Sequence, residues 1–412
     1  MKGALHDFFT LECQAELIHN AQKMDHSYEK ALLEYEKVFT TKLIKCFEQD
    51  TITGVNSKLY CYVKSVLDSV NDGSSQRIII LENVPSDPKN VSLIAEMFLL
   101  IREVFHRWIS CDLNTSIKVL NHILDKKIDM THIKYYTMPE TSTLYRGRIS
   151  DCQLEKIEFF HIPFSQLYKI RNQRFSITGQ PLLYLTDRIA GVFNELSVRK
   201  KELYEKVYIA QFRLRPDKAQ WFDKIFDMTI NADELENADN INEFYCYFCK
   251  FLLSCTCSFP NIRGRDNSYF VEEYVIPQLV TQLLKKAGFK GIRYNTINCR
   301  LHGKSSKPYN DYINYAFFTQ RANNEDALDI KLKERFVVDS PITVLKADDY
   351  DPAAIVTLPE VIEILDKHFE KINELVSIMN QIGGSVYFQD YFEEKTYLFK
   401  DGQYRFIDLN FV

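Results

Sequence analysis

The chain has 412 residues, of which 46% are hydrophobic, and its 51 basic and 56 acidic side chains give a net charge of -5. This length exceeds that of one ordinary hydrophobic core, so we expect two or three packed units. The near balance of charge excludes a global electrostatic field for attracting polyanions, and nucleic acid is therefore not an expected partner.

Neither a signal peptide nor a membrane segment is predicted. The first residues lack the charged region, apolar core and small-residue cleavage site of a secretory signal. No apolar run approaches the ~20 residues that a membrane-spanning helix needs. The 10 cysteines are scattered without a framework spacing, which favours reduced thiols. We therefore expect a cytoplasmic protein without a membrane partner.

The first third of the chain is predicted to be mostly helical. Apolar side chains recur there at helical spacing, which predicts amphipathic helices over residues 26–47, 57–70 and 90–109, the last one capped near Asn90. A short apolar run at 77–81 predicts a strand. We expect residues 1–140 to form one domain with a regulatory or oligomerising role.

The pattern changes after residue 140. Strands are predicted over residues 143–146, 182–185, 207–214, 291–294 and 312–318, with helices over 188–198 and 272–287 between them. This interleaving indicates an α+β domain over residues 141–340. Beyond it, a helix over 359–382 and a hairpin over 397–406, turning at Asp401-Gly402, predict a small accessory extension over 341–412.

An ordered set of short motifs runs through the α+β segment. Leu-Tyr-Arg-Gly-Arg stands at 144–148, Phe-His-Ile-Pro-Phe at 160–164, Gln-Arg-Phe-Ser-Ile-Thr-Gly at 173–179 and Leu-Tyr-Leu at 183–185, followed by Glu195. Further on stand Glu-Tyr-Val-Ile-Pro-Gln at 273–278, Gly-Ile-Arg-Tyr at 291–294 and Asn-Tyr-Ala-Phe-Phe at 314–318. Over about residues 141–320 this set resembles the RES domain, a family of NAD-degrading bacterial toxins with an ADP-ribosyltransferase-like fold.

The resemblance implies cleavage of the nicotinamide–ribose bond of NAD, with water or phosphate as the acceptor. It places the family's arginine on Arg146, its tyrosine on Tyr184 and its glutamate on Glu195. The family's serine falls on Thr296, which keeps a hydroxyl group and adds a methyl group. A hydroxyl from Ser305 or Ser306 is an alternative source of that group.

The implied chemistry suits these residue types. A fixed carboxylate such as that of Glu195 stabilises the positive charge that develops on the ribose as the N-glycosidic bond breaks. The guanidinium groups of Arg146 and Arg174 suit the pyrophosphate of NAD. Tyr184 offers an aromatic face for nicotinamide. NAD is thus expected as a substrate, and no metal is predicted.

Each assignment has a structural alternative. Taken alone, Tyr184 would be a core tyrosine, Glu195 a solvated helix residue, Arg146 and Arg174 surface ion-pair residues, and Thr296 a loop cap. His161 is interpreted as a structural histidine bonded to the backbone rather than as a catalytic residue.

Two other motifs are set aside. The cysteines at 246, 249, 255 and 257 begin as a Cys-x-x-Cys pair, but their apolar surroundings favour buried free thiols over a zinc site. Arg102 and His106 lie one turn apart on a predicted helix, similar to HEPN ribonucleases, although that family spaces its Arg–His pair more widely.

We therefore expect an NAD glycohydrolase or NAD phosphorylase that acts as a toxin, in a toxin–antitoxin or anti-phage defence system. Such an enzyme must be restrained until it is needed, so an antitoxin or regulatory protein and a homo-oligomer are candidate partners. Two alternatives stay open: an ADP-ribosyltransferase that modifies a macromolecule, and a catalytically inactive NAD-binding module.

Overall fold

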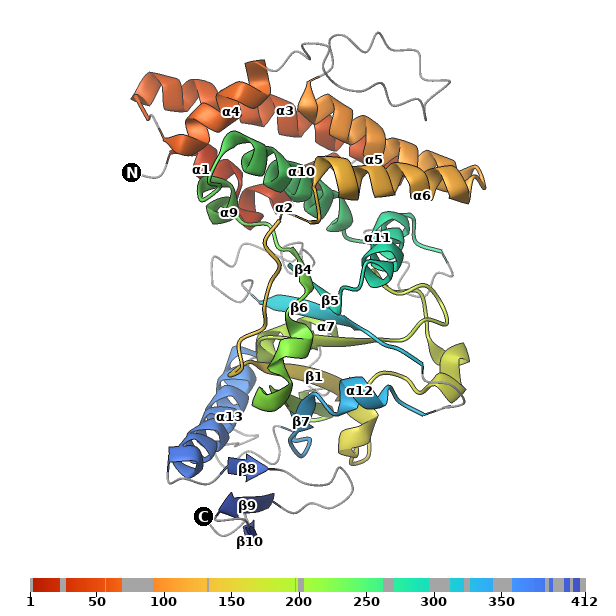
Figure 1. Ribbon diagram of the computed structural model, residues 1–412, viewed down its shortest axis with the longest axis vertical. Helices are drawn as coiled ribbons and strands as arrows, with labels where there is room; N and C mark the ends of the chain where they lie inside the picture. Colours follow the sequence, from red (N-terminus) through yellow and green to blue (C-terminus); the bar gives the residue numbers. More distant parts are fainter. Residues whose placement is uncertain are drawn as a thin grey trace. The chain divides into compact units, whose positions relative to one another are not determined.

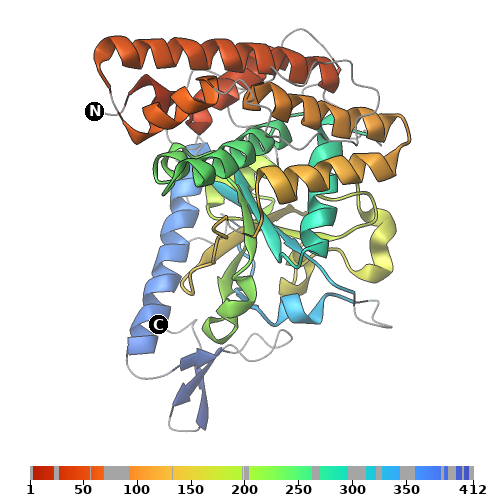
Figure 2. The same cartoon turned by 45° about the horizontal axis from the view of Figure 1, so that its top comes forward.

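The computed structural model describes residues 3–22, 27–55, 57–68, 92–131, 133–196, 198, 204–261, 270–295, 312–321, 327–343, 358–381, 385–387, 396–400 and 403–407. The chain forms two compact units, each assembled from separate stretches of sequence (Figures 1 and 2). The first unit comprises Met1–Tyr136, Arg171–Gln180 and Ile225–Ser305, and the second comprises Thr137–Ile170, Pro181–Lys224 and Ser306–Val412.

The first unit is mostly helical. Its α-helices are α1 (Ala4–Phe8), α2 (Leu11–Gln22), α3 (Tyr28–Thr53), α4 (Lys58–Asp68), α5 (Leu93–Ile109), α6 (Leu113–His122), α9 (Ala232–Glu236), α10 (Ile241–Cys257) and α11 (Val275–Lys286). A π-helical turn at Ile123–Lys127 extends α6, and a 3-10 turn at Glu272–Tyr274 precedes α11. The helices predicted over 26–47, 57–70 and 90–109 are thereby confirmed.

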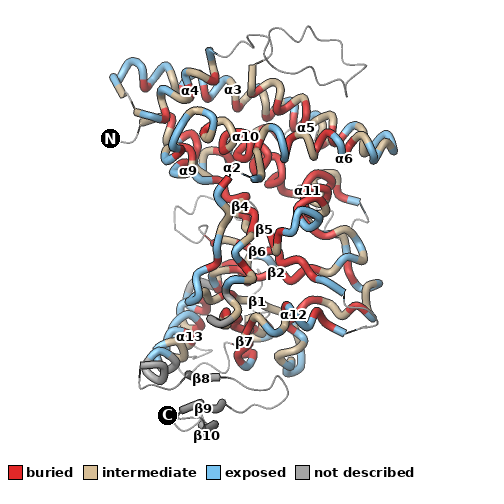
Figure 3. Tube along the Cα trace, viewed as in Figure 1, coloured by how far each residue is buried: buried red, intermediate tan, exposed pale blue. Residues whose placement is uncertain are grey.

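Local sequence explains where these helices begin and what they bury. Helix α5 begins after Ser92, two residues beyond the predicted cap at Asn90, because the Ser92 side chain accepts the backbone N–H of Ala95. Helix α10 is buried on nearly all of its sides from Phe244 to Cys257 (Figure 3). A helix that is buried on nearly all sides shows little contrast between an apolar and a polar face, so the sequence did not indicate α10.

Aromatic rings form the core of the helical unit. Tyr35 is fully buried. Its ring centroid lies 5.7 Å from that of Phe98 and 5.5 Å from that of Phe259. Its hydroxyl donates to Gln14 Oε1 at 2.6 Å, so the one polar atom of this ring is satisfied. The edge-on ring contact therefore joins α3 to α5, and the hydrogen bond joins α3 to α2.

The first unit also contains a parallel strand pair, β4 (Ile225–Met228) with β5 (Gly291–Asn295). Strand β5 confirms the strand predicted over 291–294, whereas β4 is too short to have been recognised. Across this pair Arg293 Nη1 donates to Asp227 Oδ2 at 2.6 Å, and its guanidinium lies 4.3 Å from the ring of Tyr136. Arg293 is thus neutralised within its own unit.

The second unit contains an antiparallel sheet in the order β6 (Ile313–Phe318), β2 (Leu182–Thr186), β1 (Thr143–Ile149), β3 (Val207–Leu214) and β7 (Phe336–Val338). The predicted strands at 143–146, 182–185, 207–214 and 312–318 are confirmed. Short helical segments join them: Lys156–Phe159, Phe164–Lys169, Pro216–Phe222 and α12 (Ile330–Lys333).

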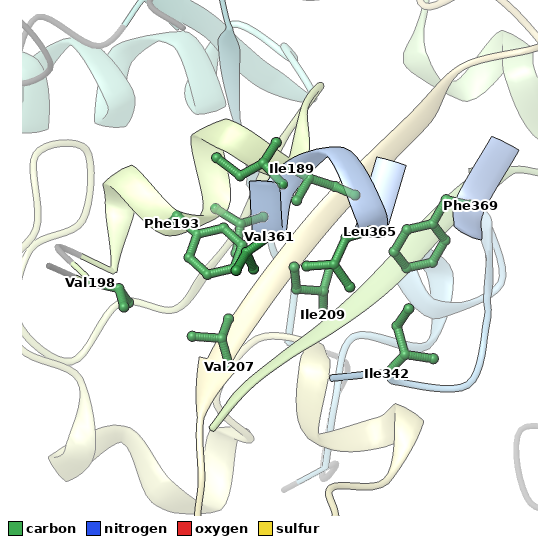
Figure 4. Close-up of a cluster of buried hydrophobic side chains, with 11 residues drawn as sticks. Ile189, Phe193, Val198, Val207, Ile209, Ile342, Val361, Leu365 and Phe369 are labelled. Atoms are coloured by element: carbon green, nitrogen blue, oxygen red, sulfur yellow. The ribbon is translucent and has the colours of Figure 1, made fainter. Parts of the chain in front are cut away.

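Two helices of the second unit, α7 (Ile189–Glu195) and α13 (Leu358–Gln381), pack on the sheet through one hydrophobic cluster (Figure 4). Val361, Leu365 and Phe369 of α13 meet Ile209 of β3 and Phe193 of α7 there. Each such buried side chain contributes about 1.5–3 kcal/mol. Helix α13, expected as part of an accessory extension, is therefore integral to the core of this unit.

A three-stranded antiparallel sheet follows α13, with β8 (Ser385–Tyr387), β9 (Thr396–Lys400) and β10 (Gln403–Ile407). Lys400 is paired with Gln403, as a two-residue hairpin turn requires. The predicted hairpin is confirmed in its strands, while Asp401 and Gly402 lie outside the described residues, as does the predicted strand at 77–81.

The chain is thus an α+β protein, as predicted, with both parallel and antiparallel strand pairs. Its two compact units are each built from separate stretches of the sequence, so their bounds differ from those of the expected domains. The division into domains 1–140, 141–340 and 341–412 stays a prediction. The ADP-ribosyltransferase-like fold also stays a prediction. Among the described residues, every helix is too short or too polar to cross a lipid bilayer.

Candidate functional site

Strand β1 carries the two arginines of the Leu-Tyr-Arg-Gly-Arg motif on one face. Gly147 lies between them and faces α7, since a Cβ atom there would come within 2.2 Å of Val192 Cγ1. Only glycine permits this close approach of strand and helix. Side chains alternate along a strand, so Arg146 and Arg148 both point to the face away from α7.

These two guanidinium groups are half-buried and lack an acidic partner. Arg146 Nη1 donates to the carbonyl oxygen of Phe160 at 3.1 Å. In the part of the chain that the structure describes, no carboxylate forms an ion pair with either arginine. Burial lowers the pKa of Arg146, and the positive charge of Arg148 lowers it further, while Tyr184 opposes this shift.

Burial also lowers the pKa of Arg148, and Glu158 opposes this shift from beyond ion-pair distance. Guanidinium groups stay protonated at neutral pH despite such shifts. Two like charges in low-dielectric surroundings are unfavourable unless a counter-charge joins them. The β1 arginines are therefore suited to hold an anion with more than one negative charge.

Tyr184 and Glu195 lie on the other face, toward α7. In the β2–β6 register Thr186 is paired with Asn314 and Tyr184 with Ala316, so these side chains share one face. Thr186 contacts α7, because a Cβ atom on Gly191 would lie 2.2 Å from its hydroxyl oxygen.

Glu195 ends α7 and has an exposed carboxylate that is held in place by Asn314. The Asn314 side chain is 2% exposed, and its Nδ2 donates to Glu195 Oε1 at 2.8 Å. This hydrogen bond from a buried amide fixes the orientation of the Glu195 carboxylate at the end of α7. The structure therefore brings Tyr184 and Glu195 to one side of β2.

The arginines on one face and Tyr184 with Glu195 on the other face meet where the pairing of β1 with β2 ends. Within these two fully described strands the register joins only Tyr145 with Thr186, whereas β1 pairs with β3 from Thr143 to Ile149. Arg146 comes directly after Tyr145 on β1, and Tyr184 comes two residues before Thr186 on the antiparallel β2, so both lie on the same side of this pair. The two residues interact electrostatically. Arg146, Tyr184 and Glu195 thus lie on adjoining elements of one unit, with Arg146 facing away from the other two.

Arg174 belongs to the other unit and has a structural role there. Its Nη1 donates to the carbonyl oxygens of Cys257 and Phe259, both at 2.8 Å, and its guanidinium lies 5.3 Å from the ring of Tyr274. A cation at the C-terminal end of α10 also interacts favourably with the helix dipole. A contact of Arg174 with NAD stays a prediction.

The remaining hydroxyl candidates, Thr296, Ser305 and Ser306, lie outside the described residues. His161 is confirmed as a structural histidine: it is buried, its Nδ1 is 2.8 Å from the carbonyl oxygen of Ile162, and its Nε2 accepts the backbone N–H of Asp329 at 2.8 Å. Acceptance at Nε2 requires the neutral ring, and burial lowers its pKa accordingly.

The motifs that were set aside have structural roles. The cysteines at 246, 249, 255 and 257 lie along α10 as free thiols, and burial raises the pKa of each. Arg102 pairs with Glu36, and His106 Nδ1 lies 4.0 Å from Glu29 Oε1. The Arg–His pair on α5 is therefore engaged by carboxylates of α3.

Two residues of this site were not singled out from the sequence, although both stand inside the quoted motifs. Arg148 lies two positions after Arg146, a spacing that places both on one face of a strand. Asn314 opens the Asn-Tyr-Ala-Phe-Phe motif, but its partner Glu195 is distant in sequence, and only the register of β2 and β6 brings the two together.

Comparison with known proteins gives one informative similarity. No family model matches the chain, and no solved structure matches it. The chain is 28% identical over 214 residues to a Bacillus subtilis (strain 168) protein named "Putative toxin YopC". This match covers 48% of the chain and 45% of that protein, so the chain spans less than half the length of this relative.

Proposed function

We propose that this chain is a toxin-like enzyme that cleaves the nicotinamide–ribose bond of NAD, as an NAD glycohydrolase or NAD phosphorylase. The observation that carries the proposal is the pair of half-buried arginines on β1, Arg146 and Arg148, which have no carboxylate partner among the described residues. The resemblance of the motifs around them to the RES domain supplies the substrate.

A dinucleotide matches the charge of this pair. The pyrophosphate of NAD carries two negative charges, and two guanidinium groups offer multiple donors in planar arrangements to its oxygens. Burial lowers the pKa of both arginines in the free protein, and a bound anion would favour their charged forms. A single phosphate would neutralise the pair less completely.

Tyr184 and Glu195 would act on the nicotinamide riboside end. The ring of Tyr184 would stack on nicotinamide, and the Glu195 carboxylate would stabilise the positive charge that develops on the ribose. The C–N bond breaks with both electrons leaving on nicotinamide, and water or phosphate adds to the ribose carbon and loses a proton. Asn314 keeps Glu195 oriented for this role.

The opposite orientation of the two residue sets constrains how NAD would bind. The pyrophosphate would contact Arg146 and Arg148 on one face, and the nicotinamide would reach Tyr184 and Glu195 on the other. NAD would therefore have to extend past the end of β1 or β2 to contact both sets, because neighbouring strands of a sheet lie only about 4.8 Å apart.

Similarity to a protein with a toxin name supports the biological part of the proposal. Loss of NAD in the cytoplasm would arrest growth, so a toxin–antitoxin or anti-phage role with an antitoxin or regulatory partner follows. Self-association of the chain is a second means of restraint. Both are tested by co-expression and by measuring the mass of the assembly in solution.

The direct experiment is incubation of the purified full chain with labelled NAD, with and without phosphate, followed by chromatography. Free nicotinamide with ADP-ribose, or with its phosphate ester, is the expected result. Label on a macromolecule would instead select an ADP-ribosyltransferase, and tight NAD binding without nicotinamide release would select an inactive binding module.

A further inference from the structure

A second cluster of chemically capable side chains lies in the helical unit. His6 of α1 faces two carboxylates of α9, and one ligand atom from each of His6, Asp233 and Glu236 lies within 4.8 Å of the others. Asp233 and Glu236 are one turn apart on α9 and so share one side of that helix. The cluster therefore joins two segments that are far apart in the sequence.

The His6 ring is placed for a metal rather than for a hydrogen bond. Its Nε2 lies 3.5 Å from Asp233 Oδ1 and 3.9 Å from Glu236 Oε1. Two ligands of one zinc ion lie roughly 3.4 Å apart when each is about 2.1 Å from the metal in tetrahedral geometry. A small inward shift of the carboxylates would thus place all three atoms around one ion.

An independent observation points to a missing partner of the histidine. The His6 side chain is only 11% exposed, and both of its ring nitrogens are buried without a hydrogen-bond partner. Buried polar nitrogens are rarely left in this state. On the Nδ1 side, Asp7 Oδ1 lies at 3.7 Å, which is beyond hydrogen-bond distance.

Space for a further ligand is present beside the cluster. A cavity of about 350 Å³ is lined by His6 and Glu236 together with Gly3, Asp50, Ser57 and Lys58. Asp50 accepts the backbone N–H groups of Ala4 and Leu5 at 2.7 and 3.0 Å, which fixes α1, and Lys58 Nζ donates to the carbonyl oxygen of Ala238. The cavity therefore provides room for water beside His6 and Glu236.

We propose that His6, Asp233 and Glu236 bind one Zn²⁺ ion, with water as the fourth ligand, and that this ion clamps α1 to α9. One imidazole nitrogen with two carboxylate oxygens suits zinc and related first-row divalent ions, whereas Mg²⁺ prefers oxygen ligands and several waters. This departs from the expectation of no metal, because the spacing of the three ligands has no sequence signature. The proposal is independent of NAD cleavage.

The test is calorimetric titration of the metal-free full chain with Zn²⁺. Exposed thiols at Cys61, Cys111 and Cys152 are first blocked with N-ethylmaleimide, because free cysteines also bind zinc. One ion per chain is expected, with at least 10-fold weaker binding in His6→Gln and Glu236→Gln. Mg²⁺ should produce no comparable heat.

Two matched variants, His106→Gln and Glu34→Gln, change exposed residues of the same unit and should bind Zn²⁺ as the wild type does. Zn²⁺ should also raise the melting temperature of the wild type but not that of Glu236→Gln, whose half-buried side chain can be replaced without loss of the fold. Absence of binding to the thiol-blocked wild type, or equal affinity in the His6 and Glu236 variants, would overturn the proposal.

Discussion

Arginines on two neighbouring strands of the same sheet have opposite surroundings. Arg213 on β3 pairs with Asp339, and the two side chains are 13% and 10% exposed. Arg146 and Arg148 on β1 are also shielded from water, yet no carboxylate in the described part of the chain pairs with them. Asp339 supplies the counter-charge for Arg213, and we propose that a ligand supplies it for the arginines of β1.

The largest stability effect is expected for Arg213→Ala. Removal of the guanidinium leaves the Asp339 carboxylate buried without its partner, which costs about 3–5 kcal/mol of the free energy of unfolding. Urea denaturation of the purified variant measures this loss, and Arg213→Leu combined with Asp339→Leu should recover part of it. Unchanged stability in Arg213→Ala would remove the contrast between the two strands.

The β1 arginines should show the opposite behaviour. Arg146→Ala and Arg148→Ala remove one of two repelling charges, so the free energy of unfolding should stay constant or rise. Loss of a charge-assisted contact to NAD, at about 1.5–3 kcal/mol, should weaken NAD binding roughly 10- to 100-fold. Calorimetry with NAD and urea denaturation give both quantities, and a stability loss like that of Arg213→Ala would identify these residues as structural.

A smaller effect is expected from His161, which the fold holds in its neutral form. Its pKa is lowered in the folded state, mainly by burial, so the unfolded chain binds the proton more readily. Its contribution to stability is therefore complete above pH 6.5, the ordinary histidine value, and is lost as the pH falls through the lowered folded pKa.

The loss should be on the order of 1 kcal/mol for each pKa unit of the shift. Urea denaturation between neutral and mildly acidic pH should show a shallower slope for His161→Gln than for the wild type. His122, whose pKa is also lowered by burial, serves as the comparison, since His122→Gln should leave the His161 contribution intact. Identical slopes in the wild type and His161→Gln would show that His161 does not resist protonation.

Local sequence patterns predicted many of the helices and strands. They did not predict contacts between residues that lie far apart in the sequence. Strand-like segments predicted β1, β2, β3, β5 and β6, and helical patterns predicted α3, α4, α5, α7, α11 and α13. The largely buried α10 and the four-residue β4 were not predicted. The motifs singled out Arg146, Tyr184 and Glu195, and the strand register then separated Arg146 from the other two by face.

Pairing could not be predicted in the same way. Asp339 and Arg213 are 126 residues apart, and Asn314 and Glu195 are 119 apart, so no local pattern joins them. Arg148 looks like an ordinary surface arginine in the sequence. It becomes a candidate ligand-binding residue because Arg213 pairs with Asp339, whereas no carboxylate among the described residues forms an ion pair with Arg148.

Comparison of nicotinamide release by the wild type and Glu195→Gln, at NAD concentrations that saturate both, tests the central claim most directly. The amide keeps the size of the side chain and removes its negative charge. The rate should fall on the order of 10³-fold, as for loss of one transition-state stabilising group, while NAD affinity and melting temperature stay near wild-type values. Equal rates in the two proteins, or no release by the wild type, would contradict the assignment of NAD cleavage to this site.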